Sequence, residues 1–485
     1  MTASVIEDEL KKQSQLAYVN HSATKPIFLT SIAVDGDNKL SPVSNALFES
    51  ILDPVLSQPL QTLEHTLESL DEVREKIMYT GLFQEVTVSL DNDVSAASVD
   101  KLKKSFPEDY ALEYPLPSIA KINLKPLEYH KYSVTSCTSD TFSSLGGRIS
   151  FINSLGRAES LVVQGDARYT PFEGKIDEQS VNTKLLLPLQ KNPSLKAVLD
   201  LTYAKLDFSN QPFLDTADEH KQNQYSLSLG VQKHWISKRT EAAPSLFTGV
   251  TMVARNVYGF KEPNAVSDSI KQFNGTFVKN SFITQFLHDS RKFFGLFPAS
   301  GSKFAIKNEY VLAQNFPNRK EAVPQDKNFD KLGISYEKHV PFFKSLIVNS
   351  MSFAYGGIFQ IGEPPAVVHT MDKFYLGGLA TLKGFERNSI GEHGGHFYCK
   401  LALASSFKIP NTPANSPLRM QFFLNAGDVF NKGPLPQSLA SSSGISLIYK
   451  TALANMDLTY AVPLSNRITD GHKPGFSFGV ALSLY

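Results

Sequence analysis

From residue 131 to the end of the chain, hydrophobic and polar residues alternate in one short segment after another. Alternation with a period of two is typical of β-strands, whose successive side chains point to opposite faces. Helical periodicity is hard to find in this part of the chain. The pattern predicts sixteen strands, over residues 131–138, 145–153, 159–168, 180–189, 195–206, 224–236, 246–256, 271–288, 302–313, 328–341, 345–361, 395–409, 418–427, 442–450, 453–463 and 475–485.

The two faces of these strands differ in chemistry. Between residues 195 and 203 one face is apolar, and the other carries Lys196, Asp200 and Thr202; residues 399–409 alternate in the same way. A soluble sandwich that buries its apolar faces and a membrane barrel that turns them to lipid would both show this alternation. Sixteen strands without crossover helices are too many for one open sheet. We therefore expect a membrane all-β fold, a 16-stranded antiparallel transmembrane β-barrel with a polar lumen.

Before residue 125 the two kinds of periodicity are mixed. Residues 27–34, 83–90 and 119–124 are predicted strands, and apolar residues at helical spacing predict helices over residues 41–54 and 59–80, the first ended by its proline. The order strand, helix, helix, strand, strand indicates an α+β unit, with two helices on one face of a three-stranded sheet.

These patterns divide the chain into three parts: a flexible N-terminal segment (1–25), the α+β domain (26–127) and the barrel (128–485). The first residues are acidic and carry no apolar run, so they resemble neither a secretory signal nor an Arg-rich transit peptide. The longest uncharged stretch, residues 345–362, is interrupted by polar residues and glycines and has strand parity. We expect no transmembrane helix.

Composition excludes some classes of function. With 48 basic and 47 acidic side chains the net charge is +1, so no overall field favours a nucleic-acid partner. The only two cysteines, Cys137 and Cys399, lie far apart in the sequence and indicate neither a disulfide framework nor a redox role.

Residues 374–385 form a connection of unusual composition, which we call the lumen loop motif. Its apolar residues would be costly to leave in water, and its glycines allow close backbone approach to a wall. We expect it to fold back into a cavity, although a turn beside an ordinary core remains an alternative. The motif reads Phe-Tyr-Leu-Gly-Gly-Leu-Ala-Thr-Leu-Lys-Gly-Phe.

Two stretches of the first domain resemble a POTRA domain, the polypeptide-transport-associated module: Leu29 to Gly36, and Tyr79 to Val88 with its Thr-Gly-Leu-Phe. The exposed sheet edge of such a module could take an extended peptide by strand addition. A sheet that only supports its neighbours is an equally open alternative.

The barrel region resembles the POTRA-plus-barrel superfamily of outer-membrane protein insertases, whose bacterial member is BamA. The family's loop before the twelfth strand reads Phe-x-x-Gly-Gly-x-x-x-x-Arg-Gly-Phe, and the lumen loop motif departs from it only at Lys383, where the family has Arg. The thirteenth strand of the family carries Phe-Phe-x-Asp-x-Gly, where this chain has Asn425 for Asp. The resemblance implies that Lys383 donates to Asn425 inside the barrel, a weaker contact than the charged Arg–Asp pair. The residues carried over are Gly377, Gly378, Lys383, Gly384 and Phe385 in the loop, and Phe423, Asn425 and Gly427 as its anchor.

Smaller matches are Gly394-Gly395, the Asp289-Ser-Arg291 segment before Pro298, and residues 460–463. A single POTRA-like unit without signal or transit peptide is similar to the mitochondrial branch, the central barrel subunit of the sorting and assembly machinery (SAM or TOB). The resemblance implies a mitochondrial outer-membrane barrel with its POTRA-like domain in the intermembrane space. Its expected partners are unfolded β-barrel precursor proteins, membrane lipids, peripheral metaxin-like SAM subunits on the cytosolic face and small intermembrane-space chaperones.

The first and last strands predict a weak seam. Ser477-x-Gly479-x-x-Leu482-x-Leu484 resembles the β-signal of mitochondrial barrel precursors, although the last strand of any barrel would look similar. The first strand, residues 132–139, is polar and short, a poor partner for an apolar last strand. The expected lateral gate comprises Tyr132, Ser133, Val134, Ser477, Gly479, Leu482 and Leu484. A passive outer-membrane pore or protein-translocation channel is the alternative function, and a soluble β-rich binding protein is a third.

Two motifs suggest chemistry without support from their surroundings. Gly475-Phe-Ser477-Phe-Gly479 matches the nucleophile pattern of hydrolases, but no helix, acid or histidine follows it. His393-x-x-His396-x-x-Cys399 has metal-ligand residue types, but His396 and Cys399 have opposite strand parity. We expect no catalytic residue, no metal and no cofactor.

Overall fold

We describe the protein from a computed structural model. The structure describes residues 23–36, 43–93, 115–170, 174–209, 211, 214–235, 242, 244–317, 328–343, 345–360, 368–391, 394–413, 416–431, 433, 435–436 and 438–484. The expected flexible segment 1–25 therefore lies almost entirely outside the described residues. The chain divides into two compact units, one of residues 1–130 with 151–160 and 187–196, and one of the remaining residues.

The first unit contains a small mixed sheet with two helices, as predicted. The strand order is β2-β1-β4-β3, in which β1 and β4 are parallel and β3 and β4 are antiparallel. Leucine, isoleucine and valine side chains from both helices and the sheet are buried together, among them Ile51, Ile77 and Ile122. The elements are β1 (Pro26–Gly36), α2 (Asn45–Leu56), β2 (Leu60–Thr62), α3 (Leu63–Tyr79), β3 (Phe83–Asn92) and β4 (Leu116–Pro126).

Two details of this unit differ from the sequence prediction. A fourth strand, β2, precedes the second helix, which begins at Leu63 because Thr62 caps it: its hydroxyl accepts a hydrogen bond from the His65 N–H at 3.3 Å. Pro54 lies inside the last turn of α2 and does not end it. The helix runs on because the Ser57 N–H still donates to the Asp53 carbonyl at 2.9 Å.

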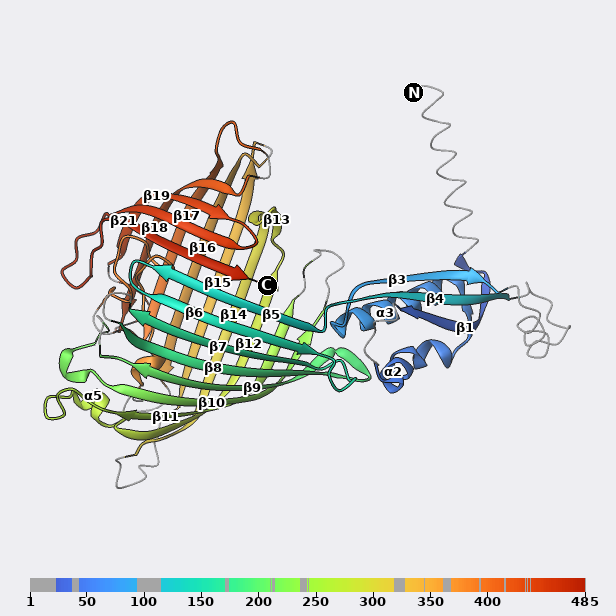
Figure 1. Cartoon of the computed structure of the whole chain (residues 1–485), viewed down its shortest axis with the longest axis horizontal. Helices are drawn as coiled ribbons and strands as arrows, with labels where there is room; N and C mark the ends of the chain where they lie inside the picture. Colours follow the sequence, from blue (N-terminus) through green and yellow to red (C-terminus); the bar gives the residue numbers. More distant parts are fainter. Residues whose placement is uncertain are drawn as a thin grey trace. The chain divides into compact units, whose positions relative to one another are not determined.

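The strands from residue 130 onward form a closed antiparallel barrel, coloured from teal to red in Figure 1. Within the described residues sixteen long strands form it, as predicted, and the three-residue β13 (Lys292–Phe294) adds a hairpin to β14. The last strand pairs with the first, which closes the barrel. The long strands are β5 (His130–Ser139), β6 (Ser143–Ile152), β7 (Ser160–Thr170), β8 (Lys175–Leu189), β9 (Asn192–Asp207), β10 (Lys221–His234), β11 (Ser245–Tyr258), β12 (Gly275–Asp289), β14 (Phe297–Asn315), β15 (Phe329–Phe342), β16 (Ile347–Gln360), β17 (Phe397–Lys408), β18 (Leu418–Phe430), β19 (Ala440–Lys450), β20 (Ala454–Pro463) and β21 (Gly475–Leu484).

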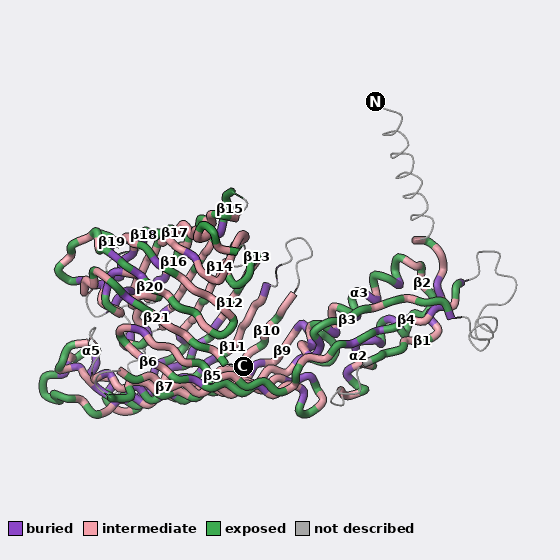
Figure 2. Tube along the Cα trace, turned by 45° about the horizontal axis from the view of Figure 1, so that its top comes forward, coloured by how far each residue is buried: buried purple, intermediate pink, exposed green. Residues whose placement is uncertain are grey.

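Exposed and less exposed residues alternate along many strands of the barrel, as the colours of Figure 2 show. Leu401 and Leu403 of β17 are 41% and 42% exposed on the outside, while Lys400 and Ala402 between them line an internal cavity. The outer face is therefore apolar and the lumen polar, the arrangement that a surrounding lipid phase requires. Among the described helices, none has both the length and the apolar character to cross a membrane.

Candidate functional site

The lumen loop motif lies in the connection between β16 and β17 and folds back against the inner wall, as expected. Leu376, Leu382 and Phe385 are all at least 98% buried. They form an apolar cluster with Val429 of β18 and Ala440 of β19. The loop is thus a packed part of the lumen.

Lys383 is the main polar anchor of this loop, and its partner differs from the prediction. Its ammonium donates to Asp457 Oδ2 at 2.9 Å, Ser446 Oγ at 2.7 Å and Thr459 Oγ1 at 3.2 Å. The expected contact with Asn425 is replaced by these, because β20 offers a carboxylate, and an ammonium binds a carboxylate more strongly than an amide oxygen. β20 therefore supplies the charged anchor for Lys383 that β18, with Asn425, does not.

The β18 residues that the family pattern singled out still contact the loop region. The Lys383 ammonium lies over the ring of Phe423, 5.2 Å from the ring centroid. Asn425 is buried and lines the same cavity as Lys383. A Cβ on Gly427 would stand 2.7 Å from Leu376 Cδ2, so only glycine leaves room for the loop there. β18 therefore holds the loop by shape, β20 holds it by the charge of Asp457, and β19 adds the Ser446 hydroxyl.

The loop's glycines are required by backbone conformation. Gly377, Gly378 and Gly384 have φ values of +123°, +97° and +88°, which L-residues rarely adopt. A Cβ on Gly377 would also stand 2.3 Å from the Glu386 carbonyl oxygen. Glycine at these positions lets the motif turn back on itself inside the barrel.

Beyond Lys383, the loop is joined to the segment that leads into the last strand. The Glu386 N–H donates to the Gly471 carbonyl at 2.8 Å, and the Lys473 N–H donates to the Gly384 carbonyl at 2.9 Å. The rings of Phe385 and His472 lie 5.4 Å apart. The lumen loop and the segment just before β21 are therefore held together.

An ion network that the sequence analysis did not identify fixes the other end of the connection. Asp372 accepts from Arg255 of β11 at 2.7 and 3.0 Å and from Lys279 of β12 at 2.8 Å. Lys279 also pairs with Glu309 of β14 at 2.7 Å, and Lys331 of β15 donates to the Asp372 carbonyl at 2.6 Å. Two basic residues on the lumen-facing parity of adjacent strands were the signal that could have revealed this cluster.

Asp372 is ionised in this setting. Burial alone would raise the pKa of its carboxyl, but the Arg255 and Lys279 cations outweigh burial and hold that pKa well below its usual range. The connection from residue 369 to residue 391 is thus attached to two walls, β11–β15 at Asp372 and β19–β20 at Lys383. It crosses the lumen between them.

The seam between β5 and β21 has a short register. Within the described residues six pairs join the two strands, from Val134 with Leu484 to Ser139 with Gly479, whereas β20 and β21 share eight pairs and β15 and β16 share fourteen. Of the expected gate residues, Val134, Gly479, Leu482 and Leu484 lie in the paired stretch. Tyr132, Ser133 and Ser477 lie beyond its two ends.

A cavity of about 470 Å³ lies between the seam and the lumen loop. Leu379 of the loop contributes to it, together with Cys137 of β5 and Ala481 of β21. Beside it, the Lys473 ammonium forms an ion pair with Asp140, in the turn that follows β5. The seam therefore has a polar closure at the end where β5 turns into β6.

The two motifs with doubtful chemistry stay without support. Ser477 lies within the strand β21. His393 lies outside the described residues, and in the described part of the chain no three His, Cys, Asp or Glu residues are grouped as metal ligands would be.

Comparison with known proteins agrees with this architecture. Residues 153–483 match the model of the Omp85 superfamily domain. A SAM50-like protein of Schizosaccharomyces pombe is 22% identical over 98% of this chain and 94% of its own length. The sorting and assembly machinery component 50 homolog of Homo sapiens is 22% identical over 87% of this chain and 84% of its own.

Two solved structures share the fold. BamA from Haemophilus ducreyi lacking POTRA domains 1–3 has a TM-score of 0.65 at 15% identity, over 94% of this chain and 85% of that one. CdiB from Acinetobacter baumannii has a TM-score of 0.60 at 13% identity, over 94% and 74%. The sequence relatives make this chain a non-enzymatic barrel protein of the mitochondrial outer membrane, consistent with outer-membrane protein assembly. The chain belongs to the Omp85 superfamily.

Proposed function

We propose that the protein is an insertase, which folds β-barrel precursors and inserts them into the mitochondrial outer membrane at a lateral gate between β5 and β21. The observation that carries this proposal is the short seam, with six residue pairs where β15 and β16 share fourteen. An incoming precursor would pair its last strand with β5 in place of β21. The exposed outer face of β21, which includes Phe476 and Phe478, already meets the lipid.

Strand exchange and burial of the precursor in lipid require no nucleotide. An antiparallel register of six pairs contains about six hydrogen bonds, worth roughly 3–9 kcal/mol in total at about 0.5–1.5 kcal/mol each. In lipid an unpaired backbone group costs several kcal/mol, so the gate opens only as fast as an incoming strand replaces these bonds. Lipid burial of the precursor's apolar faces then completes its folding.

The lumen loop would keep the last strand in place while the seam exchanges partners. Its backbone bonds to Gly471 and Lys473 hold the segment before β21, and Leu379 packs near Gly479. In this proposal β21 moves little, and β5 and the strands that follow it are the side that departs.

The remaining assignments follow from the relatives, one of which is named as a component of a sorting and assembly machinery. By analogy, this chain assembles with peripheral metaxin-like subunits on the cytosolic face. Its POTRA-like domain lies in the intermembrane space and receives precursors from small chaperones. β3, an edge of its sheet, is the strand that an extended peptide would join.

A reversible lock on the seam tests the proposal. Ala481 is the cross-strand partner of the native Cys137, so Ala481→Cys allows a disulfide across the seam. Tyr355→Cys offers a matched control, because Tyr355 faces the native Cys399 across β16 and β17, away from the seam. Both variants are reconstituted into liposomes, oxidised, and assayed for insertion of a barrel precursor.

We expect oxidation of the Ala481→Cys variant to block insertion and reduction to restore it, with the Tyr355→Cys variant active in both states. Full activity of the locked seam would refute the gate. It would favour the alternative in which the protein is a passive pore or a protein-translocation channel.

A further inference from the structure

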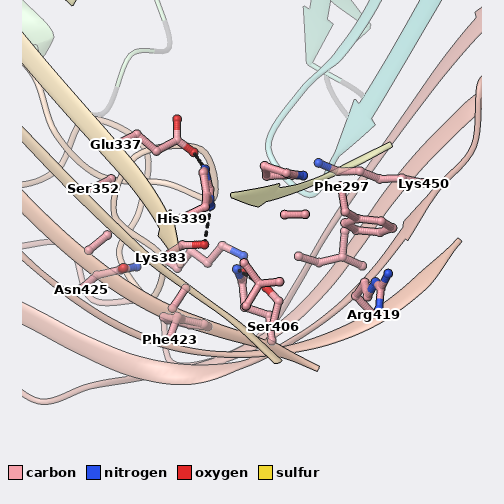
Figure 3. A pocket seen from close by; sticks show the side chains of 18 of the residues that line it. Phe297, Glu337, His339, Ser352, Lys383, Ser406, Arg419, Phe423, Asn425 and Lys450 are labelled. Atoms are coloured by element: carbon pink, nitrogen blue, oxygen red, sulfur yellow. Dashed lines mark hydrogen bonds and ion pairs between the residues drawn. The ribbon is translucent and has the colours of Figure 1, made fainter. Parts of the chain in front are cut away.

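A second cavity in the lumen, of about 480 Å³, lies between the lumen loop and the inner faces of β14 to β19. We call it the cationic chamber. Figure 3 shows Lys383, Arg419 and Lys450 on different sides of this space, with Phe297 between Arg419 and Lys450. Lys400 also lines it. Arg419 and Lys450 lie together against Phe297, whereas Lys400 stands eight residues along β17 from Lys408, the residue opposite Arg419.

The acidic side chains of this region do not neutralise the chamber. Glu337, the one carboxylate among its described lining residues, already binds His339 Nε2 at 2.8 Å and Arg291 at 3.3 Å. Lys383 is paired with Asp457. Among the described residues no carboxylate forms an ion pair with Lys400, Arg419 or Lys450. Glu337 and Asp457 attract Lys450 only at longer range, and among the described residues no carboxylate acts on Arg419.

Arg419 is the least expected of these groups. It is 93% buried, and its guanidinium makes no hydrogen bond to any described residue. Its contact is with the face of Phe297, 5.2 Å from the ring centroid, and Lys450 lies over the same ring at 5.4 Å. Lys408 stands directly opposite Arg419 in the register of β17 and β18. Like charges in that position repel each other and destabilise the sheet.

The Asp372 network shows how the same barrel treats buried cations elsewhere. There Arg255, Lys279 and Lys331 all donate to Asp372, and Glu309 adds a second carboxylate. In the cationic chamber Arg419 and Lys450 form no ion pair with a carboxylate of the described residues. A bound anion would supply the partner that those residues do not.

We propose that the cationic chamber binds a compact polyvalent oxyanion of the phosphate class. Arg419 would offer its planar fork to two oxygens, Lys450 would neutralise part of the remaining charge, and Phe297 would contact any apolar part of the ligand. Two cations held against one aromatic ring suit a compact charged group better than an extended acidic peptide. The source of the phosphate is a free phosphate compound or a lipid headgroup. The proposal is independent of the insertase function.

Isothermal titration of inorganic pyrophosphate into the full chain in a zwitterionic detergent tests this site. We expect saturable binding that weakens as salt rises, and that becomes about tenfold or more weaker in Arg419→Gln and again in Lys450→Gln. Lys184→Gln is the control, because Lys184 lines another lumen cavity and makes no ion pair among the described residues. The shift of the folded barrel on unheated gels verifies that each variant is folded.

Competition experiments identify the source of the phosphate. Displacement of pyrophosphate by dioctanoyl phosphatidic acid would assign the site to a lipid headgroup, and its failure to compete would assign it to a free phosphate compound. Both results support the proposal. Absence of pyrophosphate binding, equal binding by the Arg419→Gln variant, or binding of penta-glutamate in the absence of pyrophosphate binding would overturn it.

Discussion

Leu379 of the lumen loop lies against Gly479 of the last strand, so closely that a Cβ added at Gly479 would stand 3.0 Å from Leu379 Cδ2. Gly479 pairs with Ser139 of β5 at the end of the seam register. The loop in the lumen and the seam in the wall therefore meet at a single glycine. A change of volume at this position acts on both.

Replacement of Gly479 by valine should disturb the seam. The branched side chain would collide with Leu379, so in the Ala481→Cys background we expect a lower yield of the seam disulfide to Cys137, and slower precursor insertion. Adding Leu379→Ala should restore both, because it removes the colliding atoms. Gly333→Ala serves as the control, since a Cβ there meets only one backbone oxygen at 3.8 Å. Failure of the Leu379→Ala change to rescue would show that the effect lies in β21 alone.

The Lys383 anchor should behave as a coupled pair with Asp457. Both side chains are partly exposed to the lumen, so we expect Lys383→Met and Asp457→Asn each to lower the free energy of unfolding by only about 1–2 kcal/mol. The double variant should lose less than the sum of the two, because each single change already breaks the contact. Urea unfolding in lipid vesicles measures this cycle. Strict additivity would contradict the pairing, and the Lys383→Met/Asn425→Ala cycle provides the comparison.

Removal of the Asp372 carboxylate should lower the free energy of unfolding more than loss of the Lys383–Asp457 pair does. Asp372→Asn leaves Arg255 and Lys279 buried with a weaker partner, and we expect a loss of about 3–5 kcal/mol in the free energy of unfolding. Asp200→Asn is a suitable comparison, because Asp200 lies in the lumen and accepts from the neutral Asn182 at 2.7 Å. A similarly small loss of unfolding free energy in both variants would mean that the ion network around Asp372 is exposed to water.

The pH dependence of that loss follows from the direction of the Asp372 pKa shift. A carboxyl whose folded pKa is depressed stabilises the fold above its unfolded pKa of about 4, and loses that contribution as the pH falls through the folded pKa. The difference in unfolding free energy between the wild type and Asp372→Asn should therefore be constant from about pH 8 to about pH 5 and shrink below about pH 4. A difference that already narrows between about pH 7 and pH 5 would show that the carboxyl is not held ionised.

The sequence alone determined the strands of the barrel and the face that each residue occupies. Strand alternation is a local property, because neighbouring Cβ atoms point to opposite sides whatever the partner strand is. The apolar parity of β17, with Leu401 and Leu403 outside, could therefore be predicted without a structure. The glycine-rich motif likewise indicated a loop that packs against a wall, since its apolar side chains would be costly to leave in water.

Only the tertiary structure decided which side chains meet across the lumen. The family resemblance implied that Lys383 contacts Asn425. Closure of the barrel and the course of the loop instead place it beside Asp457, 74 residues further along the chain. Arg255 and Asp372 meet across 117 residues, and no local pattern marks either as the partner of the other. The parity of a strand indicates which side chains face the lumen. The path of a connection through the barrel decides which of these side chains pair with one another. The same path leaves Arg419 without a carboxylate partner among the described residues.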